Sequence, residues 1–201
     1  MDINFFNDNL EENVVKIQHK DVKLFLIKNL FDNNSFKELQ SEIMKLMLDL
    51  ENWENFTNQS INRKVLKHGV SKLIDNLSGF NLTKTKLLSY VNKIMDENYT
   101  SCIFKVWWDT GGYFIPWHCD NDKVDTSLQL YVTNVSHNYL GTAFAYINEN
   151  DNNMESNIPF LILPYIKNSG YIFKNTDTIR HGMTMSVPNG FDRISLYIYI
   201  N

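Results

Sequence analysis

His118 and Asp120 stand two residues apart, and this H-x-D pair is the first place where the sequence indicates chemistry. We expect the pair at the end of a strand, in which alternate side chains point the same way, so that an imidazole and a carboxylate can bind one ion. A motif this short also occurs by chance. His19 and Asp21 repeat the spacing beside an isolated expected strand and without further candidate ligands, so we interpret that second pair as accidental.

Two later residues give this first pair a context. His181 lies in another expected strand, followed by Gly182, and Arg193 comes about a dozen residues later. Two neutral imidazoles and one carboxylate match the facial triad that binds Fe(II) and leaves positions open on the metal. The sequence therefore predicts an iron site made by His118, Asp120 and His181. Its open positions suit a chelating 2-oxo acid and O₂.

Arg193 shares one face of its expected strand with Ser195, because alternate residues of a strand point the same way. A guanidinium offers a planar fork that matches a carboxylate with two hydrogen bonds, and it keeps its charge in a pocket. We therefore expect Arg193 to hold an anionic group. The alternative is a structural salt bridge, for which Asp192 and Glu155 are the candidate partners.

The elements that must position these residues change character near residue 101. Before it, the sequence predicts a strand over 22–28 and helices from Ser35 onward, over 61–77 and over 83–97. Ser35 and Glu38 form the capping-box pattern that begins a helix. After it, short runs rich in β-branched and aromatic residues alternate with turn residues. These runs predict strands at 102–108, 113–118, 127–133, 141–147, 158–163, 170–174, 179–185 and 193–200.

Two of the expected strands, 127–133 and 193–200, have an aliphatic face and a polar, aromatic face. Each fits a sheet with the core on one side and a hydrated pocket on the other. The alternative is that the polar face is exposed to bulk solvent. Many strands after a helical half predict an α+β fold. We expect a double-stranded β-helix, or jelly roll, of about eight strands over 101–201, buttressed by helices within 1–100.

Composition narrows the remaining possibilities. With 201 residues and 43% hydrophobic content, the chain is long enough for one well-buried core, and we expect a single domain over 1–201. No run approaches the roughly 18 apolar residues of a membrane helix, and we expect no secretion signal. A net charge of −4 with scattered lysines argues against a nucleic-acid partner. Cys102 and Cys119 lack C-x-x-C spacing, which favours a reducing compartment and a cytoplasmic protein.

The order of H-x-D, a distal H-G pair and an R-x-S motif resembles the 2-oxoglutarate and Fe(II)-dependent oxygenases, particularly their prolyl-hydroxylase-like branch. The likeness extends over most of 22–200 and is weakest over 50–100. It implies that iron is bound by His118, Asp120 and His181. It also implies that the C5 carboxylate of 2-oxoglutarate is held by Arg193, Ser195 and Tyr131. Many members of the branch have lysine in place of this arginine, so the branch alone does not predict proline as the substrate.

The resemblance implies an enzyme that couples oxidative decarboxylation of 2-oxoglutarate to succinate with hydroxylation of a substrate. Its cofactors would be Fe(II), 2-oxoglutarate and O₂, with ascorbate as a reductant, and desaturation or demethylation would use the same ligands. A peptide side chain and a small molecule both remain open as substrates, and the oligomeric state is open too. The alternatives are a non-catalytic jelly-roll binding module and a cupin-like metalloenzyme independent of 2-oxoglutarate, because fold alone does not decide function.

Overall fold

The strands of the described residues form two antiparallel sheets. The computed structural model describes residues 10–18, 22–56, 62–67, 80–120, 124–133, 135–146 and 158–201. The large sheet consists of β1 (Val14–Lys16), β2 (Leu24–Lys28), β3 (Trp53–Asn55), β4 (Arg63–Leu66), β5 (Cys102–Asp109), β6 (Thr126–Tyr131), β9 (Ser169–Lys174) and β11 (Arg193–Ile200). The small sheet consists of β7 (Ala143–Tyr146), β8 (Leu161–Ile162) and β10 (Ile179–Gly182).

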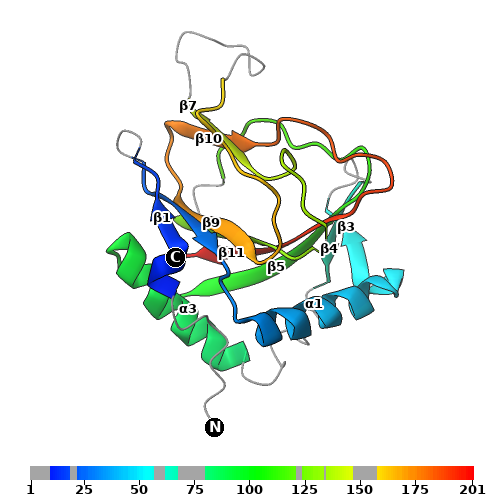
Figure 1. Ribbon diagram of the computed structural model, residues 1–201, viewed down its shortest axis with the longest axis horizontal. Helices are drawn as coiled ribbons and strands as arrows, with labels where there is room; N and C mark the ends of the chain where they lie inside the picture. The colour runs from blue at the N-terminus through cyan, green and yellow to red at the C-terminus, as the bar shows by residue number, and fades with distance from the viewer. Residues whose placement is uncertain are drawn as a thin grey trace.

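The strand order of the large sheet is β1-β2-β9-β6-β11-β5-β4-β3, and that of the small sheet is β10-β7-β8. Helices α1 (Asn33–Met47) and α3 (Phe80–Met95) lie below the large sheet in Figure 1, and the small sheet lies above it. Two 3₁₀ turns complete the elements, η1 (Leu10–Asn13) and η2 (Leu50–Asn52). Among the described residues, no helix is both long and apolar enough to cross a membrane.

The face of the large sheet that meets the helices is apolar. Strand β11 contributes Ile194, Leu196, Ile198 and Ile200, all buried, as the alternation in the sequence predicted. The same core contains residues of β6 and of both helices: Leu128, Leu130, Phe36, Leu39, Ile43, Leu87, Val91 and Met95. Burial of this aliphatic surface is the main force that holds the helices to the sheet.

Helix α1 begins earlier than predicted. Its N-cap is Asp32, whose carboxylate accepts hydrogen bonds from the backbone N–H groups of Asn34 (2.9 Å) and Ser35 (3.1 Å). Ser35 therefore lies in the first turn, and its hydroxyl donates to Asp32. An aspartate at this position satisfies N–H groups that the helix leaves unpaired, so it competed with the capping box that the sequence offered three residues later.

The helix predicted over 61–77 is wrong in its described part. Residues 63–66 form strand β4, which pairs with β3 on one side and β5 on the other. Residue 61 and residues 68–77 of that segment lie outside the described residues. Pairing with the neighbouring strand β3 and the distant strand β5 overrides the local helical pattern, which is weak over four residues. Strands β1 to β4 thus extend the sheet, so the first hundred residues are more than the helical support that we expected.

Seven of the eight strands predicted after residue 101 have a counterpart, and the exception is 113–118. Gly112 just before it has a positive φ of 86°, and Pro116 within it has no N–H to donate. The segment instead makes separate backbone hydrogen bonds to the loop after β10, such as Met183 N to Ile115 O (3.0 Å). It is held in place without forming a regular ladder.

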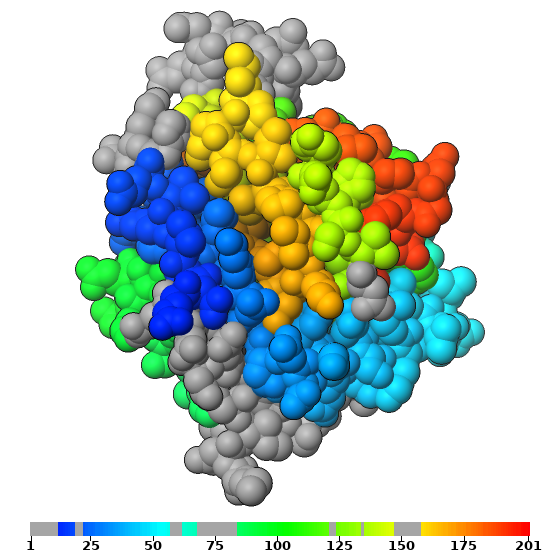
Figure 2. Space-filling view, in the orientation of Figure 1, coloured from blue at the N-terminus to red at the C-terminus, as the bar shows by residue number. Residues whose placement is uncertain are grey.

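The front of the molecule is closed by segments that are distant in sequence. In Figure 2, the yellow-green segment 135–146 packs beside the orange segment 165–174. His137 and Tyr165 exchange backbone hydrogen bonds of 2.8 Å at this junction. The two sheets therefore enclose the space between them from this side.

Candidate metal centre

His118, Asp120 and His181 come together in the space between the sheets. Their ligand atoms all lie within 4.8 Å of one another. Nε2 of His181 is 3.5 Å from Oδ1 of Asp120, and Nε2 of His118 is 3.8 Å from the same oxygen. His181 belongs to β10, while His118 ends the irregular segment 113–118 and Asp120 follows it. The structure thus brings together three residues that the sequence placed in two separate segments.

Outer hydrogen bonds orient two of these side chains, His118 and Asp120. Nδ1 of His118 donates to the backbone carbonyl of Pro116 (2.9 Å), and this tautomer leaves the Nε2 lone pair facing the other two residues. Oδ2 of Asp120 accepts hydrogen bonds from Ser127 Oγ (2.6 Å) and Tyr197 OH (2.8 Å). Its Oδ1 is the oxygen that faces the imidazoles. Three donor atoms therefore converge, each held by a partner or strand behind it.

The protonation states of two of these groups also suit a metal. Burial, with a further contribution from His181, lowers the pKa of His118 to about 4, so this imidazole is neutral at neutral pH. Burial acts to raise the pKa of Asp120, but hydrogen bonds from His181, Ser127 and Tyr197 outweigh it and hold that pKa well below its usual value. Neutral imidazole and ionised carboxylate are the forms that bind a divalent ion. The donor set fits the facial triad of non-haem Fe(II) sites.

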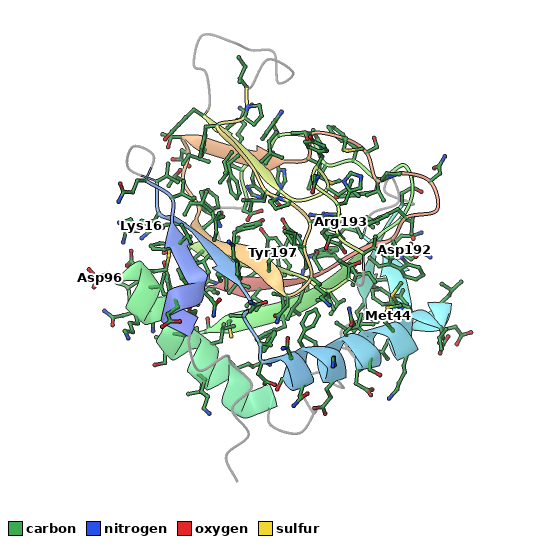
Figure 3. The ribbon with its side chains drawn as sticks, viewed as in Figure 1. Lys16, Met44, Asp96, Asp192, Arg193 and Tyr197 are labelled. Atoms are coloured by element: carbon green, nitrogen blue, oxygen red, sulfur yellow. The ribbon has the colours of Figure 1, made fainter. Side chains whose placement is uncertain are left out.

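A cavity of about 280 Å³ opens at this cluster, and Arg193 lines it together with all three residues. Figure 3 shows Arg193 and Tyr197 between the two sheets. Aromatic residues form much of the remaining wall, among them Trp107 and Tyr199. One cavity therefore holds a candidate metal centre and a buried guanidinium, the two features that the sequence predicted to work together.

Asp109, and neither predicted residue, is the salt-bridge partner of Arg193. Nη1 of Arg193 donates to Oδ2 of Asp109 (2.6 Å), and Nε donates to the carbonyl of Leu140 (2.8 Å). The carboxylate is fully buried and the guanidinium is 2% exposed. Asp192 binds a tryptophan indole instead, and Glu155 lies outside the described residues. Arg193 is thus both a salt-bridge residue and a wall residue of the cavity.

Arg63 is a second guanidinium in the cavity wall, and the sequence reasoning missed it because it lay in a predicted helix. In β4 it stands directly across from Asp109 of β5, which stands across from Arg193 of β11. Its Nε donates to Oδ1 of Asp109 (2.8 Å). Its guanidinium carbon lies 4.4 Å from the ring centre of Trp107 and 4.6 Å from that of Tyr113. We call these three charged side chains, Arg63, Asp109 and Arg193, the arginine row.

Tyr131 and Ser195 belong to a hydrogen-bonded network that reaches the cavity through Gln129 and Thr142. The hydroxyl of Tyr131 accepts from the backbone N–H of Thr142 (2.8 Å) and donates to Oγ1 of Thr142 (3.1 Å). Ser195 Oγ accepts from Nε2 of Gln129 (2.9 Å), whose Oε1 accepts from Thr142 Oγ1 (2.8 Å). All four side chains are buried, and Gln129 and Thr142 line the cavity. Contact of Tyr131 and Ser195 with a co-substrate stays a prediction.

No protein-family model matches the chain, and no curated protein sequence matches it. Solved structures do match. A prolyl hydroxylase from Trichoplax adhaerens, in complex with a hypoxia inducible factor peptide fragment, has a TM-score of 0.61 and 16% identity, covering 88% of this chain and 82% of that one. A prolyl-4-hydroxylase of Pseudomonas putida has a TM-score of 0.58 and 10% identity, covering 89% and 91%. The chain has the fold of the 2-oxoglutarate and Fe(II)-dependent oxygenases.

That oxygenase fold fits the predicted jelly roll and confirms the resemblance that the sequence motifs indicated. The fold also hosts other reactions. SnoN, a non-haem alpha-ketoglutarate-dependent epimerase of nogalamycin biosynthesis, has a TM-score of 0.62 at 8% identity, covering 89% of this chain and 77% of its own. The likeness therefore concerns the fold, and the chemistry of this chain has to be argued from its own residues.

Proposed function

We propose that the protein is a non-haem Fe(II) dioxygenase that uses 2-oxoglutarate as its co-substrate. The observation that carries this proposal is the cavity that contains both the His118, Asp120 and His181 cluster and the guanidinium of Arg193. The cluster would hold Fe(II), and Arg193 would pair with the distal carboxylate of the co-substrate. A dicarboxylic 2-oxo acid has a chelating end for the metal and an anionic end for the arginine, so it matches both.

The iron, 2-oxoglutarate and O₂ would supply the oxidising chemistry, with release of succinate and CO₂. The protein's own residues would orient the metal ligands and exclude water from the site. Pro116 fixes the tautomer of His118, while Ser127 and Tyr197 fix the rotation of Asp120. Trp107 and Tyr199, which line the cavity, would help to exclude water from the cluster.

The arginine row explains how Arg193 can attract an anion although it already pairs with Asp109. One carboxylate lies between two guanidinium groups, so the three described side chains keep one net positive charge. A buried charge without a counter-charge is costly. A carboxylate bound in the cavity would supply that counter-charge. Asp109 neutralises one of the two guanidinium groups, and because Arg63 is the second, a net positive charge remains for the bound carboxylate.

We further propose hydroxylation of a peptide side chain or of a small molecule as the reaction, with ascorbate as a reductant. The Trichoplax relative was solved with a peptide fragment, and SnoN takes part in the biosynthesis of a small molecule, so these relatives support both classes. Desaturation and demethylation would need the same residues.

The test is an anaerobic titration of the Fe(II)-loaded protein with 2-oxoglutarate, followed through the metal-to-ligand charge-transfer band. We expect saturable binding in the parent protein and none in His118→Ala. Admitting O₂ should then release succinate, faster with a substrate from a panel of peptides and small molecules. Iron binding without 2-oxoglutarate binding would contradict the proposal and favour the cupin-like metalloenzyme. Absence of both would favour the binding module.

A further inference from the structure

Tyr171 has a buried hydroxyl that lacks a hydrogen-bond partner among the described residues. The residue is 1% exposed and belongs to β9, where it stands across from Gln129 of β6. It lines the same cavity as the metal cluster and Arg193. Buried polar groups in native proteins are nearly always hydrogen-bonded, and an exception needs an explanation. An exception in the wall of a binding cavity points to a ligand atom that completes the bond.

The ring of Tyr171 is fixed, so its hydroxyl has little freedom to find another partner. Phe144 of the small sheet packs edge-on against it, with ring centres 5.1 Å apart and ring planes at 89°. Its strand runs very close to β6, since a Cβ on Gly170 would lie 1.8 Å from the backbone oxygen of Gln129. Packing from both sheets thus holds the hydroxyl in the cavity wall.

Tyr131, on the neighbouring strand β6, provides a contrast. Both tyrosines are 1% exposed and lie on the cavity side of neighbouring strands, β6 and β9. The hydroxyl of Tyr131 is satisfied by the backbone and side chain of Thr142. The hydroxyl of Tyr171 has no such bond. Of these two tyrosines, the one that the sequence did not single out is therefore the one whose hydroxyl is available to a ligand.

We propose that the Tyr171 hydroxyl donates a hydrogen bond to a carboxylate oxygen of the bound 2-oxoglutarate. This inference rests on the proposed function, because Tyr171 lines the cavity in which a 2-oxo acid would reach from the metal cluster to Arg193. A carboxylate is a strong acceptor for such a donor. Burial raises the pKa of Tyr171 far above its usual value. The hydroxyl therefore keeps its proton and can donate it in a hydrogen bond to a carboxylate oxygen.

Tyr171→Phe removes the hydroxyl and keeps the ring. In the metal-free protein we expect an unchanged or higher thermal midpoint, because the substitution removes an unsatisfied buried group. Iron content should be normal. The affinity for 2-oxoglutarate in the anaerobic titration should fall roughly ten- to hundred-fold, which corresponds to about 1.5–3 kcal/mol at about 1.4 kcal/mol per decade.

Tyr131→Phe is the matched control for stability. It should lower the midpoint of the metal-free protein, since it leaves the Thr142 N–H without its acceptor. An unchanged 2-oxoglutarate affinity in Tyr171→Phe would overturn the inference. So would a loss of metal-free stability as large as that of Tyr131→Phe, because the hydroxyl would then have an internal partner. The parent protein is titrated first, so a failure of the proposed function appears as no binding in the parent and is distinct from either result.

Discussion

The two faces of the large sheet differ in how their interactions are satisfied. On the helix side, β11 presents aliphatic side chains, whose hydrophobic packing is non-directional. On the cavity side, the same strand presents Arg193, Ser195 and Tyr197, and each has a specific partner: Asp109, Gln129 and Asp120 respectively. One strand thus serves the fold with its even-numbered residues and the site with its odd-numbered ones. The comparison suggests that stability and ligand binding can be changed separately.

The largest expected effect is on metal binding, at the cavity side. His118→Ala removes one of three ligands and should abolish stoichiometric Fe(II) binding, while the fold is retained because the residue lies outside the apolar core. Metal content after loading and desalting measures this. His137→Ala, a histidine outside the cluster, is the control and should keep its iron. Retention of parental iron content in His118→Ala would remove this residue from the proposed ligand set.

Arg193→Leu tests whether the two faces are as separate as they look. It leaves Asp109 paired with Arg63 and removes the hydrogen bonds that Arg193 donates to Asp109 and to the carbonyl of Leu140, which should destabilise the fold by about 1–3 kcal/mol. The same loss of charge should weaken 2-oxoglutarate binding roughly a hundred- to several-thousand-fold. Chemical unfolding and the anaerobic titration measure the two effects, and iron content should be normal in the folded protein. Arg193→Lys keeps the charge and should lose less of both; equal losses would contradict the role of the charge.

Leu128→Ala, on the helix side, should produce the opposite pattern. The side chain is fully buried in the core, so its truncation should cost about 2–5 kcal/mol in the free energy of unfolding. Iron and 2-oxoglutarate affinities of the folded protein should stay at parental values, because this residue does not line the cavity. A specific loss of co-substrate affinity would show that the helix-side core also shapes the site.

Ser195→Ala should have the smallest effect of the series. It removes the acceptor of a buried amide, Nε2 of Gln129, and should lower stability by about 1–3 kcal/mol. If the hydroxyl also contacts 2-oxoglutarate, as the resemblance implies, affinity should fall less than in Arg193→Leu. A larger fall than in Arg193→Leu would reverse the proposed order of the two residues. The measurement is the same titration, on both variants side by side.

Local patterns predicted the parts of the fold that depend on local geometry. Alternation along β6 and β11 predicted which side chains face the core, because a strand sends neighbouring residues to opposite sides. The same patterns failed for β4, whose conformation depends on pairing with the distant strand β5 as well as with its chain neighbour β3. They also failed over 113–118, where individual bonds to the loop after β10 replace a ladder. Both errors concern contacts that a local window does not contain.

The candidate site was likewise predicted only in part from the sequence. The spacing of the H-x-D pair, the H-G pair and Arg193 was visible in the sequence, and the structure brings these residues to one cavity. The partnership of Arg63 with Asp109 was not visible, because it depends on the register of three neighbouring strands. Asp192 was the obvious partner for Arg193 by sequence distance. Asp192 instead lies just before β11, accepts a hydrogen bond from the indole of Trp108 and does not line the cavity.

The pair of backbone hydrogen bonds between His118 and His181 has a consequence for how the site forms. Each residue's N–H donates to the other's carbonyl, at 3.0 and 2.9 Å, so the two imidazoles are brought together by main-chain pairing. The spacing of these two donors is therefore set when the protein folds and does not depend on an ion. Little ordering is then left to accompany metal binding. These two amide protons should exchange slowly with solvent deuterium even in protein stripped of metal.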